Sequence, residues 1–131
     1  MQMILFKMNQ QCYLISADMV EEVIDTIHMT PVPLAPRWVE GLINLRGTVM
    51  TVINLAELIQ IPRPAFHRNI LIMKQEEEKK GLLIEEVIEV LNIQPEDLQL
   101  KEDTEADYYS GIVSFPDKVA NVIDVNHLIF E

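Results

Sequence analysis

The chain has 131 residues, a length that predicts one domain or two closely joined subdomains. Apolar residues make up 49% of it, enough for a substantial core, but no apolar run is long enough to cross a bilayer. The formal net charge of −11 opposes binding to nucleic acid and to anionic membrane surfaces.

The N-terminal part predicts a hairpin, a further strand and a connector. Residues 3–8 read as a short apolar strand, and 12–16 return beside it after a polar turn. Residues 20–27 are rich in Val and Ile and suit either a strand or a helical turn followed by a strand. Three prolines between residues 31 and 36 predict a rigid, extended connector on the surface.

A second hairpin follows this connector. Residues 42–45 and 49–53 are expected to pair around a turn at 46–48, in which Gly47 can adopt a positive φ. Asn54 is a candidate N-cap for a short helical turn over residues 55–60, which Pro62 ends.

The second half repeats this series of elements. Residues 69–74 and 81–84 predict a hairpin around a charged turn, and 85–93 match 20–27. The stretch from Gly41 to Ile59 aligns without a gap with the stretch from Gly111 to Ile129, with six identities, and Asp124 takes the capping place of Asn54. Two copies are too few for a solenoid, whereas five strands in each half predict two small barrels with a shared core, joined near residues 61–68.

Patterns typical of catalysis are missing from the sequence. The three serines lie outside any nucleophile elbow, the four glycines are isolated, and His28, His67 and His127 lack the spacing of metal ligands. We therefore expect a protein that is not an enzyme and uses neither a cofactor nor a metal. The N-terminus lacks a secretory pattern, and the single cysteine, Cys12, has no partner for an internal disulfide, so both features fit a cytoplasmic protein.

The segment from Val20 to Pro62 contains the Glu22–Val23 pair, the connector ending in Ala35–Pro36, the run GLINLRG at 41–47 and the VINL at 52–55. In these features, and in their continuation through 81–90 and 111–129, the chain resembles the CheW family, the coupling proteins of bacterial chemotaxis. The resemblance implies an all-β domain over residues 1–131, built from two intertwined five-stranded SH3-like barrels with short helical turns. We expect subdomains at about 14–68 and 69–131, with the N-terminal strand within 1–13 crossing to the second barrel.

The resemblance also implies a function. Family members are non-catalytic adaptors that join the cytoplasmic tips of chemoreceptors to the histidine kinase CheA, whose regulatory domain has the same fold. Such a protein is cytoplasmic, is recruited to membrane-associated receptor arrays, and neither enters the membrane nor binds nucleic acid. Two alternatives are an adaptor of another chemosensory pathway, such as surface motility, and, from a different class, a small-molecule or sugar enzyme built on a barrel.

Four residues match the family's receptor-binding positions. They are Arg46, which can pair with Glu22, together with Val20 and Gly41. Without the resemblance, Arg46 would read as solvated surface and Val20 equally well as an ordinary core residue.

Three further residues are possible interface positions. Trp38 suits a core filler or an interface anchor equally well. Gly47 lies in the turn that carries Arg46, and Val49 begins the strand after it. The chain departs from the family at Thr51, where relatives often have Pro, and at Asn54, where they have Asp. These changes alter the charge near the hairpin and bear on which kinase the protein would pair with.

Overall fold

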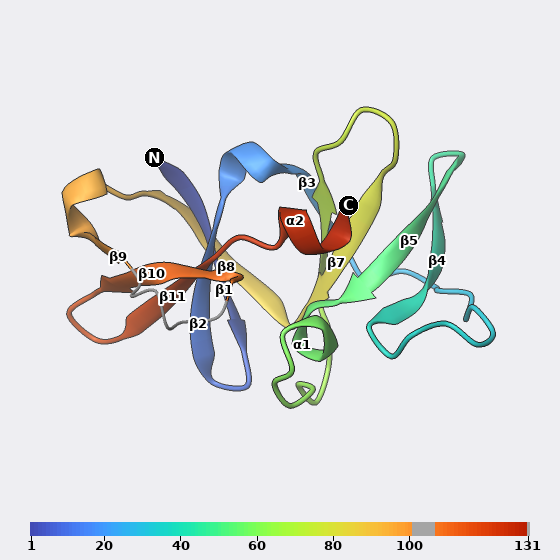
Figure 1. Ribbon diagram of the computed structural model, residues 1–131, viewed down its shortest axis with the longest axis horizontal. Coiled ribbons are helices and arrows are strands. Elements are labelled where there is room, and N and C mark those ends of the chain that lie inside the picture. The colour runs from blue at the N-terminus through green and yellow to red at the C-terminus, as the bar shows by residue number, and fades with distance from the viewer. Residues whose placement is uncertain (101–106, 131) are drawn as a thin grey trace.

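The computed structural model describes residues 1–100 and 107–130, which form two antiparallel-rich sheets side by side (Figure 1). One sheet has five strands in the order β3-β6-β7-β5-β4, and the other has six in the order β8-β1-β2-β11-β10-β9. The strands are β1 (Gln2–Met8), β2 (Gln11–Ser16), β3 (Val20–Asp25), β4 (Val39–Leu45), β5 (Thr48–Asn54), β6 (Asn69–Met73), β7 (Lys80–Ile84), β8 (Glu86–Asn92), β9 (Leu98–Leu100), β10 (Tyr109–Ser114) and β11 (Val119–Ile123). Four short helices complete the described fold, η1 (Ala17–Met19), α1 (Leu55–Leu58), η2 (Pro95–Asp97) and α2 (Asn126–Ile129).

The two sheets exchange hairpins. The N-terminal hairpin β1–β2 pairs with β8 and β11 of the second half, and the hairpin β6–β7 pairs with β3 and β5 of the first half. The intertwined all-β fold is therefore confirmed. The expected boundary at residue 68 does not follow the sheets, because β6 and β7 lie in the sheet of the first half. Sequence repeats give the order of the hairpins but not the strands with which each hairpin pairs.

Each sheet curls around its own core, and a third core lies between the sheets. In the five-stranded sheet, Ile24 of β3 and Ile43 of β4 pack in one cluster although these strands are the two edges. A cluster inside the six-stranded sheet likewise includes Leu91 of β8 and Leu98 of β9, again from opposite edges. The largest cluster contains residues of both sheets, such as Phe6 and Leu71. The sheets are thus two barrels that share a common core.

The exchanged hairpins are buried on both faces. Along β6, Ile70 and Ile72 point into one barrel, whereas Leu71 and Met73 point into the core between the barrels. Strand β1 alternates in the same way between the six-stranded barrel and the shared core. Strands buried on both sides need apolar side chains at every position, which explains the uninterrupted apolar runs at residues 3–6 and 70–73.

The repeated hairpins have the same register. Gly41 lies opposite Val52 and Gly111 lies opposite Val122, and a bulge directly precedes each glycine in its strand. Both glycines admit a close backbone neighbour, because an added Cβ would lie 2.7 Å from the Thr30 carbonyl oxygen at Gly41 and 2.2 Å from that of Gln99 at Gly111. The repeat therefore preserves a close strand contact as well as the hairpin itself.

The helical turn after each repeated hairpin differs between the halves. Asn54 is fully buried and its Oδ1 accepts a hydrogen bond from the Glu57 N–H at 3.1 Å, so the predicted N-cap of α1 is confirmed. In the second copy, the N-cap position of α2 is Val125, and Asp124 accepts from the Asn126 N–H at 3.1 Å instead. Asp124 was expected to be the N-cap residue, but it lies one residue before the N-cap of α2.

The connector between α1 and β6 contains a half-buried histidine, His67. Its Nε2 is buried and has no hydrogen-bond partner among the described residues. Burial lowers the pKa of His67 below 6.5, an effect that Arg63 reinforces and that Glu40 and Glu85 oppose. At neutral pH the partly buried imidazole of His67 is therefore uncharged.

The close approach at Gly41 predicts a large difference between two glycine substitutions in one hairpin. Gly41→Ala forces a Cβ against the Thr30 carbonyl, so we expect a loss of about 2–3 kcal/mol in the free energy of unfolding. Gly47→Ala meets open space and bears only the cost of a positive φ, about 1 kcal/mol. Urea denaturation of both variants measures the difference, and equal midpoints would contradict the assigned contact.

Neutral His67 predicts a loss of stability in mild acid. As pH falls below 6.5 the unfolded chain binds a proton that the folded protein, with its lowered pKa, does not yet bind, so the free energy of unfolding declines. His67→Gln should make this decline shallower as the pH falls from neutral through 6.5. His28→Gln, which removes an exposed histidine, is the control, and an unchanged slope in the His67 variant would refute the role of this residue.

Candidate partner-binding site

Arg46 lies in a two-residue turn at the end of the five-stranded barrel. Leu45 and Thr48 are paired, and the residues between them, Arg46 and Gly47, have φ values of 51° and 89°. Two positive φ values are the mark of a type I′ turn, the geometry that matches the twist of a hairpin. The positive φ expected for Gly47 is confirmed, whereas that of Arg46 was not foreseen, because arginine gives no signal for it.

The Arg46 side chain links the two edges of the barrel. Its guanidinium donates to an Oε1 of Glu22 on β3, the strand at the opposite edge of the sheet from the hairpin β4–β5. The Arg46 side chain is 67% exposed and that of Glu22 is 32% exposed. A pair this exposed contributes about 0–1 kcal/mol to stability, so its main effect is to fix the direction of the guanidinium.

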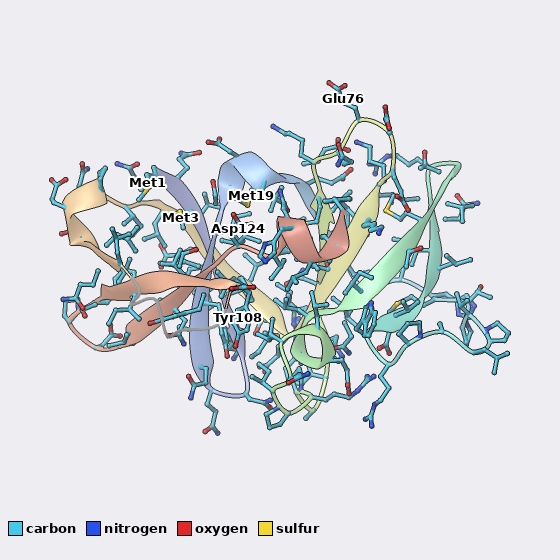
Figure 2. The ribbon with its side chains drawn as sticks, in the orientation of Figure 1. Met1, Met3, Met19, Glu76, Tyr108 and Asp124 are labelled. Atoms are coloured by element: carbon cyan, nitrogen blue, oxygen red, sulfur yellow. The ribbon has the colours of Figure 1, made fainter. Side chains whose placement is uncertain are left out.

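A second ion pair lies beside the first. Lys79 donates to Glu21, and both ion pairs line one hollow of about 170 Å³, whose apolar part includes Met50 and Ile72. Lys79 belongs to the charged turn between β6 and β7, whose tip residue Glu76 points away from the barrels (Figure 2). The sequence predicted only a charged turn here, so it did not predict the ion pair between Lys79 and Glu21.

Two of the expected receptor-binding residues are not on the surface. Val20 is 8% exposed and packs in the core between the barrels, which is the core alternative considered for it. Gly41 is buried at the β4 bulge against Thr30. The packing of Val20 in the core fixes the position of β3, and the close contact of Gly41 with Thr30 fixes the position of β4. Both residues therefore help to position the Glu22–Arg46 pair without belonging to the exposed surface.

Trp38 lines a different hollow from Arg46. This hollow has a volume of about 740 Å³ and lies between the end of the proline-rich connector and the α1 region. The Trp38 side chain is 43% exposed, so it is a surface residue and not a core filler. Val49, in the Arg46 hairpin, is 62% exposed, as is its repeat equivalent Val119 at 51%.

Charged side chains are networked around the Trp38 hollow. Arg63 donates from Nε to Glu57 at 2.8 Å and from a terminal nitrogen to Glu40 at 3.2 Å. The bond from Arg63 lowers the pKa of Glu57, and the same bond raises the pKa of Arg63. Glu40 in turn accepts from the Asn54 Nδ2 at 3.1 Å, which ties this network to the cap of α1.

Comparisons with known proteins agree with this architecture. The CheW-like domain model matches residues 2–131. The chemotaxis protein CheW of Thermotoga maritima is 30% identical over 129 residues, covering 96% of this chain and 85% of that protein, and the CheW of Bacillus subtilis is 26% identical, covering 97% and 85%. The crystal structure of the scaffolding protein TtCheW from Thermoanaerobacter tengcongensis matches with a TM-score of 0.87 at 27% identity, covering 99% of this chain and 87% of that one.

None of the described helices is long and apolar enough to traverse a membrane. The match to the family model covers nearly the whole chain, and the fold agrees with that of a solved relative. The chain therefore belongs to the CheW family of non-catalytic scaffold proteins, and the expectation that it is not an enzyme is confirmed.

Proposed function

We propose that this chain is a chemotaxis adaptor that couples the cytoplasmic tips of transmembrane chemoreceptors to the histidine kinase CheA. The observation that carries the proposal is the exposed Arg46 fork held by Glu22, in a chain that matches the family over residues 2–131. The relatives named as chemotaxis proteins and the relative described as a scaffold support it. In this role the protein would act in the cytoplasm, at arrays of receptors.

The receptor site in this proposal is centred on Arg46. A planar guanidinium offers several donors in a fixed arrangement, and Glu22 sets its orientation before a partner arrives. Val20 and Gly41 contribute by holding strands β3 and β4 in place.

Apolar surface suited to a receptor helix lies on the two strands that border the shared core. Val20 of β3 belongs to that core and Val87 of β8 packs against it. Further along these strands Val23 is 38% exposed, Ile88 42% and Val90 53%. An amphipathic helix can bury its apolar face on such side chains, while a polar residue of the helix meets Arg46.

The kinase is proposed to bind elsewhere, through edge strands and loops of one barrel. On the six-stranded barrel, the exposed Val119 of β11 and Leu100 of the edge strand β9 offer apolar contact of this kind, in the other sheet from the Arg46 hairpin. Separate receptor and kinase surfaces are what an adaptor needs, because both partners must be bound at once.

Arg46→Ala should sharply reduce receptor-dependent activation while the fold remains intact. The exposed pair with Glu22 contributes about 0–1 kcal/mol, and alanine keeps the same Cβ at the positive φ of residue 46. Activation should fall sharply, also in Arg46→Lys, because an ammonium does not replace the planar fork. The measurement is kinase activity in reconstituted receptor arrays, with thermal melts in parallel.

Arg68→Ala is the matched control for that experiment. Arg68 is 61% exposed and pairs with Glu86, which is 31% exposed, at 3.2 Å, so it closely resembles Arg46 and Glu22 in exposure. The control should retain activation. An Arg46→Ala protein that folds and activates the kinase as well as the wild type would refute the receptor site, and an equal loss in both variants would show a general effect of lost surface charge.

Binding to the CheA regulatory domain should depend only weakly on salt. Salt does not weaken apolar contacts, and it screens only the long-range electrostatic effects of the net charge of −11. We expect the Kd to change by less than about tenfold between low and physiological ionic strength in isothermal titration. A greater weakening with salt would identify a charge-driven contact in place of an apolar one.

A further inference from the structure

Charge is distributed very unevenly along the chain. Residues 26–75 contain five cationic and two acidic side chains, whereas the rest of the protein contains five cationic and nineteen acidic ones. Residues 26–75 include the proline-rich connector, β4, β5, α1 and β6, and thus most of the five-stranded barrel. This part of a strongly acidic protein is the one that an acidic partner can approach.

The Trp38 hollow, with a volume of about 740 Å³, lies within this part. Its apolar lining comes from Pro36, Trp38, Ile61 and Pro62, and its cationic lining from Arg37 and Arg63. A half-exposed Trp in a hollow that two prolines also line offers a wide, rigid apolar surface at little entropic cost.

The two arginines of the hollow compete for a single carboxylate oxygen. Glu57 Oε1 accepts from Arg63 at 2.8 Å and from Arg37 at only 3.4 Å. Arg63 also donates to Glu40. Within the described residues, the side chain of Arg37 has a single hydrogen bond, the one to Glu57. The Arg37 side chain is 85% exposed, so most of its donors remain available beside Trp38.

The same connector carries a strained apolar tip. Residues 32–35 form a turn closed by a bond from the Ala35 N–H to the Val32 carbonyl at 3.4 Å, with Pro33 second and Leu34 third. Leu34 has a φ of 62°, at the position where a type II turn favours glycine, and its side chain is fully exposed. The positive φ of Leu34 destabilises the isolated protein, and the exposed side chain makes no packing contact in the described chain that would offset this strain. Backbone strain of this kind is concentrated at surfaces that bind a partner or ligand.

We infer that the Trp38 hollow is a docking site for an acidic segment of a partner protein, in which an apolar side chain of leucine size lies between carboxylates. The apolar side chain covers Trp38 and the neighbouring prolines, and a carboxylate binds the free donors of Arg37. Charge-assisted bonds from a guanidinium to a carboxylate are among the stronger hydrogen bonds in proteins. This site shares no lining residue with the Arg46 hollow, so it is independent of the proposed receptor contact.

The single tryptophan of the chain makes the docking site directly observable. The probe is a short acetylated peptide in which two leucines are flanked on both sides by glutamates, titrated against the intact protein. We expect a saturable change in Trp38 emission, because the peptide removes the indole from water. Arg37→Gln should weaken binding about tenfold, as expected for the loss of a charge-assisted bond. Arg46→Ala should leave it unchanged.

Two controls decide the outcome. The same peptide with glutamine in place of glutamate should bind about tenfold more weakly, and equal binding would overturn the proposal by showing mere apolar association. An Arg37→Gln variant with wild-type affinity, or no emission change at millimolar peptide, would also overturn it. Sedimentation of the protein alone is the last test, since an emission change that follows self-association would assign the hollow to a second copy.

Discussion

The structure depends on the core that lies between the two barrels. This core is built largely from the inner faces of the exchanged hairpins, through residues such as Phe6 and Met8 of β1 and Leu71 and Met73 of β6. Each of these hairpins also fills the barrel in which it is paired, so its side chains are withdrawn from water on both sides. Burial of a large apolar side chain contributes about 1.5–3 kcal/mol, and a hairpin buried on both faces therefore fixes two barrels at once.

That constraint leaves the functional residues free to lie at the periphery. The Arg46 turn and the Trp38 hollow are both built on β4 and the residues around it, an edge strand whose hairpin partner β5 is anchored by parallel pairing with β7. Rigid strands carry the exposed side chains, and the packing behind them, at Val20 and Gly41, sets where those side chains point. Residues that affect binding in such a site need not touch the partner.

The sequence predicted the elements of the fold better than their partners. Local signals identified the hairpins, the Asn54 cap and the turn at Gly47, because each depends on residues close together in the chain. The exchange of β6 and β7 between the halves was not predicted, because strand pairing over long distances leaves no local mark. For residues 20–27 the sequence left open a strand or a helical turn followed by a strand. The structure has a strand over 20–25, preceded by the short helix η1.

The candidate site shows the same limit. The family resemblance indicated Arg46 and Glu22, and the structure brings these two together. Two features of the site were not predicted, the burial of Val20 in the core and the Lys79–Glu21 ion pair. Both depend on contacts between strands and a turn that are far apart in the sequence. The positive φ of Arg46 had no signal either, because arginine occupies that region only where the hairpin twist imposes it.

The hairpin exchange also bears on the origin of the chain. The pairings are equivalent in the two directions, since β1 joins β8 and β6 joins β3 in antiparallel fashion, while β2 joins β11 and β7 joins β5 in parallel. A single ancestral unit with this sequence pattern could have completed its barrel by accepting the hairpin of an identical neighbour. Gene duplication and fusion of such a swapped homodimer would produce the present topology, with the connector between α1 and β6 as the fusion joint.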